Sequence, residues 1–239
     1  MKVLLFCGGM GMRLGGDTNP LPKPMVPVGD RPMVVHIMHY YAYFGHTEFI
    51  LCVGWKADII RDYFSKRPDC VPNDWTISVR DTGIDANLGQ RLLASRECFE
   101  PGETFFANYA DGLSSVRLSK MYEFHKASEG TATFVAVSPK YHSFHVIESK
   151  DSGQVQKIYP VDQAGVWMNG GFFIFDYDIF EHINEGEELV EEPFDRLINA
   201  EKLHAYHYPG FWGCMDTYKE KAMLDEMYAS GEAPWVFSD

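Results

Sequence analysis

A glycine-rich loop near the N-terminus holds the residues best suited to chemistry. Gly8, Gly9 and Gly11 follow an apolar run, and Arg13 and Lys23 add two cations in the next stretch of chain. Glycines let backbone N–H groups approach an anion closely, and fixed cations help to hold it. The loop therefore predicts a site for the phosphates of a nucleoside triphosphate.

The glycine spacing fits neither of two common phosphate motifs. A Walker loop needs four residues between its glycines and then Gly-Lys-Ser/Thr, and a dinucleotide fingerprint needs a third glycine after two further residues. The chain has Gly8-Gly9-x-Gly11-x-Arg13 with Lys23-Pro24-Met25 behind it. A bare glycine turn is common without any ligand. The whole pattern, however, resembles the signature of the sugar-1-phosphate nucleotidyltransferases.

Two acids are candidates for holding a metal ion. Asp111 follows an apolar strand and precedes a glycine, while Asp216 stands just before a predicted helix. The carboxyl ends of parallel strands present ligands at one edge of a sheet, and carboxylates are preferred ligands of Mg²⁺. Each acid alone also fits a structural role, Asp111 in capping a turn and Asp216 as a helix N-cap.

The resemblance extends from residue 1 to about residue 236, and it is strongest to the family members that transfer a cytidylyl group to glucose-1-phosphate. The segments that carry it are Phe211-Trp212-x-x-Met215-Asp216-Thr217, Trp167–Phe173, Glu191-Glu192-Pro193 and Gly231–Trp235. It implies a magnesium-dependent enzyme that joins CTP to a sugar 1-phosphate and releases pyrophosphate. It also implies a homo-oligomer.

Site residues follow from the resemblance by position. Arg13, Lys23 and Asp111 are implied as catalytic, and Asp111 with Asp216 as the Mg²⁺ ligands. Lys23 also belongs to the implied acceptor site, whose other members are Asn169, Gly170 and Glu192. The implied nucleotide contacts are Gly8, Gly9, Gly11, Met12 and Arg13 for the phosphates, and Thr82, Gly89 and Arg91 for the base.

The chain departs from the family pattern where the acceptor is expected. Met12 replaces a hydroxyl residue, Lys157 is out of register with the family's phosphate-gripping lysine, and His145 replaces a glycine near the sugar. Two alternatives therefore stay open. One is transfer to an unusual sugar phosphate or a phosphorylated non-sugar. The other is a non-catalytic module that binds nucleotide-sugars.

Composition restricts the class of protein. The 239 residues are 46% apolar, which is enough for one globular domain with a full core. A net charge of −13 argues against binding nucleic acid or an anionic membrane. No run of about 18 apolar residues and no signal-type pattern is found, so we expect a cytoplasmic enzyme. Five scattered cysteines suggest reduced, structural thiols.

Apolar runs and segments of helical length alternate along the chain, which predicts a helix-covered, mostly parallel sheet. Together with the resemblance, this gives an α/β fold of three layers, α/β/α and Rossmann-like, with a mixed central sheet. We expect a single domain over residues 1–239, with a nucleotide-binding half (1–137) and an acceptor-binding half (138–239). The expected strands are Val3–Cys7, Glu48–Val53, Trp75–Val79, Thr104–Ala107, Ala132–Val137, His145–Glu148, Gly171–Phe175 and Leu203–His207; the expected helices are Pro32–Phe44, Lys56–Ser65, Leu88–Arg96, Ser119–Ser128, Tyr177–Glu185, Pro193–Ala200 and Thr217–Ser230.

Overall fold

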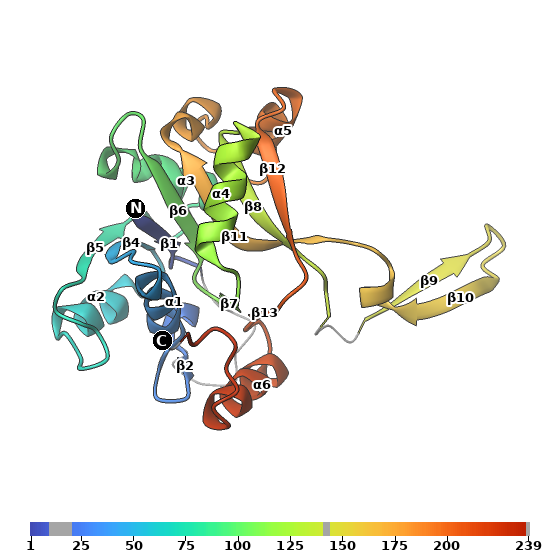
Figure 1. Ribbon diagram of the computed structural model, residues 1–239, viewed down its shortest axis with the longest axis horizontal. Coiled ribbons are helices and arrows are strands. Elements are labelled where there is room, and N and C mark those ends of the chain that lie inside the picture. Colours follow the sequence, from blue (N-terminus) through green and yellow to red (C-terminus); the bar gives the residue numbers. More distant parts are fainter. Residues whose placement is uncertain (10–20, 141–143, 238–239) are drawn as a thin grey trace.

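A seven-stranded sheet forms the centre of the molecule (Figure 1). The computed structural model describes residues 1–9, 21–140 and 144–237. Within this sheet as described, β11 alone runs antiparallel to the other strands. The expected mixed, mostly parallel sheet is therefore confirmed. In spatial order its strands are β12 (Leu203–Tyr208), β8 (Ala132–Val137), β11 (Met168–Asp176), β6 (Thr104–Tyr109), β1 (Val3–Phe6), β4 (Glu48–Val53) and β5 (Thr76–Asp81).

Helices cover both faces of the sheet, which gives the three-layer arrangement. Successive side chains of a strand point to opposite faces, and in β1 Val3 and Leu5 join one buried cluster while Leu4 and Phe6 join the other. The first cluster includes side chains of α1 (Met33–Tyr43), α2 (Ala57–Ser65), α4 (Leu118–Ser128) and α6 (Tyr218–Ala229); the second includes side chains of α3 (Leu88–Ala94) and α5 (Glu192–Asn199).

Short elements complete the chain. They are the 3₁₀ helices η2 (Lys23–Met25), η3 (Arg96–Cys98), η4 (Val161–Gln163) and η5 (Tyr177–His182), and the strands β2 (Pro27–Val28), β3 (Arg31–Pro32), β7 (Gly112–Ser114), β9 (His145–Ser149), β10 (Val155–Pro160) and β13 (Trp212–Cys214). No helix in the described ranges is long and apolar enough to cross a membrane.

Two expected elements differ from the structure. The strand expected at residues 145–148 is present as β9, but it pairs with β10 in a hairpin that projects from the body instead of joining the central sheet (Figure 1). Most of its side chains are exposed, so no burial draws it into the core. The helix expected over residues 177–185 is the 3₁₀ helix η5, which ends at His182 because the chain is already extended at Ile183.

Candidate active site

Two short strands bring the two candidate metal-binding acids together. Asp111 precedes β7, and Asp216 comes two residues after β13. These strands pair antiparallel, with Cys214 opposite Gly112, and the N–H of Met215 donates to the carbonyl oxygen of Asp111 at 2.9 Å. A sheet contact between distant parts of the chain therefore sets the two carboxylates side by side.

Lys23 lies against both acids. Its Nζ donates to Oδ2 of Asp111 at 2.6 Å and to Oδ1 of Asp216 at 2.5 Å. Pro22 and Pro24 flank it and fix the backbone from which the side chain extends. Burial by itself would lower the pKa of Lys23, but the charges and hydrogen bonds of the two carboxylates outweigh it and raise the pKa. Lys23 is therefore a cation held between two anions.

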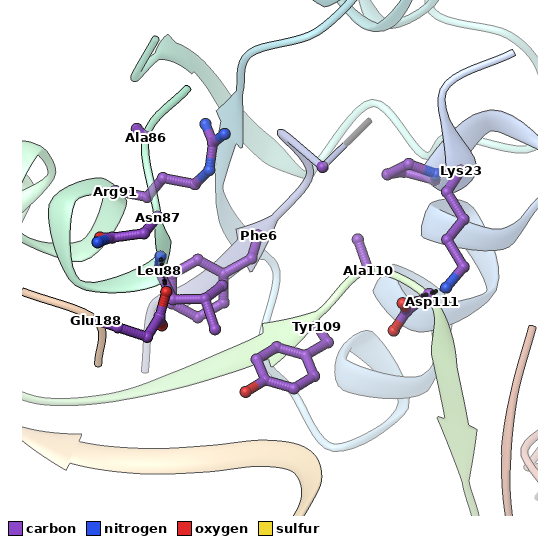
Figure 2. A pocket seen from close by; sticks show the side chains of 12 residues that line it. Phe6, Lys23, Ala86, Asn87, Leu88, Arg91, Tyr109, Ala110, Asp111 and Glu188 are labelled. Atoms are coloured by element: carbon purple, nitrogen blue, oxygen red, sulfur yellow. Dashed lines mark hydrogen bonds and ion pairs between the residues drawn. The ribbon is translucent and has the colours of Figure 1, made fainter. Parts of the chain in front are cut away.

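A cavity of about 310 Å³ opens next to this ion pair, and its size suits a small-molecule ligand (Figure 2). Four of the expected site residues line it: Gly9 and Arg91 from the nucleotide contacts, Asp111 from the metal ligands, and Lys23 from the catalytic and acceptor residues. The other lining residues were not expected from the sequence; they are Phe6, Pro24, Ala86, Asn87, Leu88, Tyr109, Ala110 and Glu188. The carboxyl ends of β1 and β6 and the start of α3 thus frame one pocket.

The two ends of the cavity differ in chemistry. Lys23 and Asp111 lie on one side, and Asn87, Leu88 and Glu188 lie together on the other (Figure 2). Burial, with the charges of Glu188 and Asp111, raises the pKa of Tyr109, so this phenol stays protonated and can donate a hydrogen bond. One end of the cavity therefore carries Lys23 with the two carboxylates that are candidates for a divalent ion, and the other end carries Glu188.

Arg91 ties together the loops around the cavity. Its Nη1 donates to the carbonyl oxygens of Val53 and Gly83 and to Oγ1 of Thr82, and its Nη2 donates to the carbonyl oxygens of Gly8 and Ile84. The side chain is only 4% exposed. Arg91 and Thr82 therefore bond to each other and to the chain in this structure, and their contact with a base stays a prediction.

Glycines permit these close contacts. A Cβ at Gly8 would lie 2.1 Å from Nη1 of Arg91, and a Cβ at Gly89 would lie 2.2 Å from the carbonyl oxygen of Glu187. Asn87 caps α3 just before Gly89, because its side chain accepts from the N–H of Gln90. Gly8 and Gly89 thus have packing roles that any ligand contact would add to.

Gly170 and Asn169 lie at the start of β11. The carbonyl oxygen of Gly170 accepts from Nε1 of Trp212 at 2.7 Å, and Oδ1 of Asn169 accepts from the N–H of Gly171. Gly171 has a φ of +74°, and a Cβ there would lie 2.4 Å from the Tyr109 ring. Glu192 is exposed at the first position of α5. Asn169, Gly170 and Glu192 are not among the residues that line the cavity.

Two of the three residues that depart from the family pattern, His145 and Lys157, lie on the projecting hairpin. Lys157 is in β10, where its Nζ is 3.2 Å from a carboxylate oxygen of Glu148. His145 begins β9 and is exposed. Neither lines the cavity. Gly11, Met12 and Arg13, which the sequence suggests for phosphate binding, lie outside the described residues.

Asp216 also belongs to a wider group of possible metal ligands. Ligand atoms of Cys214, Asp216 and Glu220 lie within 4.8 Å of one another. However, Oε2 of Glu220 accepts from the N–H groups of Asp216 and Thr217 as part of a capping box at the start of α6. Asp111 and Asp216, held at one cation, are therefore the better candidates for a divalent ion.

The cavity lies at the carboxyl edge of the parallel strands β1 and β6, which is where open α/β sheets bind their ligands. Residues 2–230 match the family model for nucleotidyl transferases. A glucose-1-phosphate cytidylyltransferase of Salmonella typhimurium is 31% identical over 98% of both chains. A mannose-1-phosphate guanyltransferase of Pichia angusta is 28% identical, over 95% of this chain and 63% of that protein.

Solved structures agree on the fold. A UDP-glucose pyrophosphorylase from Acinetobacter baumanii superposes with a TM-score of 0.71 at 18% identity, over 95% of this chain and 92% of the other. HddC from Yersinia pseudotuberculosis gives a TM-score of 0.72 at 17% identity, over 95% and 99%. The chain belongs to the nucleotidyl transferase family, within its sugar-1-phosphate nucleotidyltransferases.

Proposed function

We propose that this enzyme joins CTP to a sugar 1-phosphate, glucose-1-phosphate or a close relative, and releases pyrophosphate. A phosphate oxygen of the acceptor attacks the α-phosphorus of CTP while pyrophosphate leaves on the opposite side. That oxygen is already ionised near neutral pH, so the step needs no strong base. Alignment and charge neutralisation supply most of the catalysis.

The cluster of Lys23, Asp111 and Asp216 is the observation that supports this proposal most directly. A cation already lies between the two carboxylates, at 2.6 and 2.5 Å, so the pair fits a positive charge. We assign Asp111 and Asp216 as the residues that hold Mg²⁺, which when bound would neutralise charge on the phosphates. Lys23 bridges the donor and acceptor phosphates, and Arg13 steadies the triphosphate.

The two ends of the cavity suggest how the nucleotide lies. The phosphates belong near Lys23 and the glycines of the first loop, because a divalent ion on Asp111 and Asp216 would make that end positive, whereas Glu188 at the other end would repel them. The base and ribose then lie toward Leu88 and the segment from Thr82 to Arg91. The choice of CTP is supported by the similarity to the glucose-1-phosphate cytidylyltransferase of Salmonella typhimurium.

The acceptor belongs to the half of the chain after residue 137. We assign Asn169, Gly170 and Glu192 to the acceptor site. Both sites belong to a single domain, whose first half holds the nucleotide. Lys157 on β10 pairs with Glu148 and does not line the cavity. Another group must therefore hold the acceptor phosphate, and Lys23 is the described cation best placed for this. An unusual sugar phosphate or a phosphorylated non-sugar remains the alternative acceptor.

The test is pyrophosphate release with Mg²⁺, scanning CTP, dTTP, UTP, GTP and ATP against a panel of sugar 1-phosphates. We expect release with CTP and glucose-1-phosphate, and at least about tenfold less with the other nucleotides. Release with CTP and only a different phosphorylated acceptor would support the alternative. Nucleotide binding without release from any pair would contradict an enzyme and favour a binding module.

We also propose that the enzyme is a homo-oligomer and that the projecting hairpin takes part in the contact. Ile147 and Ile158 are cross-strand partners on one face of it and are 56% and 64% exposed. A lone two-stranded hairpin is marginally stable in water, so a partner surface would stabilise it. Two chains that each carry a net charge of −13 repel each other over most of their surfaces. The repulsion is weaker at the hairpin, because Lys150 and Lys157 offset the charge of the acids in this segment.

Light scattering after size exclusion tests this contact. We expect the wild-type protein to have the mass of an oligomer and the double variant Ile147→Thr/Ile158→Thr to shift toward the monomer, because the apolar face is lost. Glu148→Gln, on the opposite face of the hairpin, is the matched control and should keep the wild-type mass. A wild-type monomer at micromolar concentration, or a double variant of unchanged mass, would exclude the hairpin contact.

A further inference from the structure

Lys23 occupies the position that the proposed function gives to a divalent cation. Its Nζ contacts one oxygen of each carboxylate, Oδ2 of Asp111 and Oδ1 of Asp216. The Lys23 side chain is 14% exposed, and the two acids are 30% and 36% exposed. Lys23 is therefore the least exposed side chain of the cluster, and its ammonium lies between the two carboxylates.

An ammonium and a divalent ion compete for such a pair. Magnesium contacts carboxylate oxygens at about 2.1 Å, and a charged N–H donor approaches them at about 2.7–2.9 Å. Two cations that both use these oxygens would lie only a few ångströms apart, and a partly buried site screens their repulsion poorly. Binding of one cation therefore weakens binding of the other.

The Lys23 side chain can also reach the cavity. Its side chain lines the cavity as well as contacting the acids (Figure 2). The flanking prolines hold the backbone, while four flexible side-chain bonds allow the ammonium to move without moving the loop. A cation released from the carboxylates would therefore face the space in which the nucleotide phosphates are expected.

We propose that Lys23 is an internal counter-ion of the metal site. In the metal-free protein its ammonium holds Asp111 and Asp216 together, and metal binding transfers it into the cavity, where it contacts phosphate. This inference rests on the proposed function and deepens it. It gives Lys23 two opposite effects, since the same residue weakens metal binding to the free enzyme and supports turnover.

Titration of the free protein with Mn²⁺, followed by electron paramagnetic resonance, tests this without activity or nucleotide. We expect Lys23→Met to bind Mn²⁺ about tenfold tighter than the wild type, because the competing cation is gone. Lys120→Met removes the same charge from a surface pair with Glu123 and should change the affinity less than about twofold.

Unchanged or weaker Mn²⁺ binding by Lys23→Met would overturn the competition. Asp111→Asn separates this failure from a failure of the proposed function. If it weakens Mn²⁺ binding while Lys23→Met does not tighten it, only the counter-ion role is wrong. If Asp111→Asn leaves Mn²⁺ binding unchanged, the assignment of the metal ligands is wrong.

A measurement on the wild-type protein covers the case in which Lys23→Met folds poorly. Acetylation of single lysines, followed by mass spectrometry, reports how accessible each ammonium is. We expect Mn²⁺ to speed modification of Lys23 by about fivefold and to leave Lys120 unchanged as the internal reference. An equal or lower rate at Lys23 with saturating Mn²⁺ would contradict the transfer.

Discussion

Replacing Asp111 by Asn is expected to lower kcat by about 10³-fold. The change keeps the shape of the side chain and removes the charge that, with Asp216, would hold the divalent ion. The β7–β13 pairing uses backbone atoms, including the carbonyl oxygen of Asp111, so the fold should survive. Steady-state pyrophosphate release and circular dichroism measure the two effects.

Asp58→Asn is the matched control for this variant. Asp58 is 90% exposed and pairs with Arg61 on α2, so losing its charge should change kcat less than about twofold. An Asp111→Asn protein with wild-type turnover would remove Asp111 from the catalytic group. An unfolded variant would instead assign the residue a structural role, as the capping of a turn predicts.

The second large effect is expected for Arg91→Met. This substitution leaves the carbonyl oxygens of Gly8, Val53, Gly83 and Ile84 without their guanidinium donor at a site where the side chain is 4% exposed. We expect the free energy of unfolding to fall by about 2–4 kcal/mol, measured by urea denaturation. Nucleotide affinity should fall as well, because the loops around the cavity separate.

The half-exposed Arg61 provides the comparison for Arg91. Arg61→Met should change the free energy of unfolding by less than about 0.5 kcal/mol, since its ion pairs lie at the surface. If Arg91→Met lost nucleotide affinity at unchanged stability, Arg91 would be a direct contact to the base instead of a clamp between loops. Unchanged stability and unchanged affinity together would rule out both roles.

Strands buried on both faces were the most predictable part of the fold. The expected bounds of β4 and β8 match the structure because both are mostly apolar, with only Glu48 at the start of β4 and Thr133 within β8 as exceptions, as is typical of strands covered by helices on both faces. The projecting hairpin was less predictable. β9 was expected as a strand but not as part of a hairpin, and β10 was missed because its exposed residues carry no clear period.

The residues of the candidate site also differ in how far the sequence could predict them. Residue type and the resemblance suggested Lys23, Asp111 and Asp216 as candidates, and the structure places the three together. Their meeting could not be predicted, because β7 and β13, which bring the acids together, have three residues each and no readable period. Glu188 was missed because it stands in an acid-rich stretch typical of a solvated surface. The hydrogen bonds of Arg91 depend on loops that are adjacent only in the folded chain.

Following the α-phosphorus is the most direct test of cytidylyl transfer. CTP labelled with ³²P at the α position would be incubated with the enzyme, Mg²⁺ and glucose-1-phosphate, and the products separated by chromatography. The account predicts that the label moves into a nucleotide-sugar while the pyrophosphate is unlabelled. Label that stays in CTP, or that appears as free CMP, would contradict it.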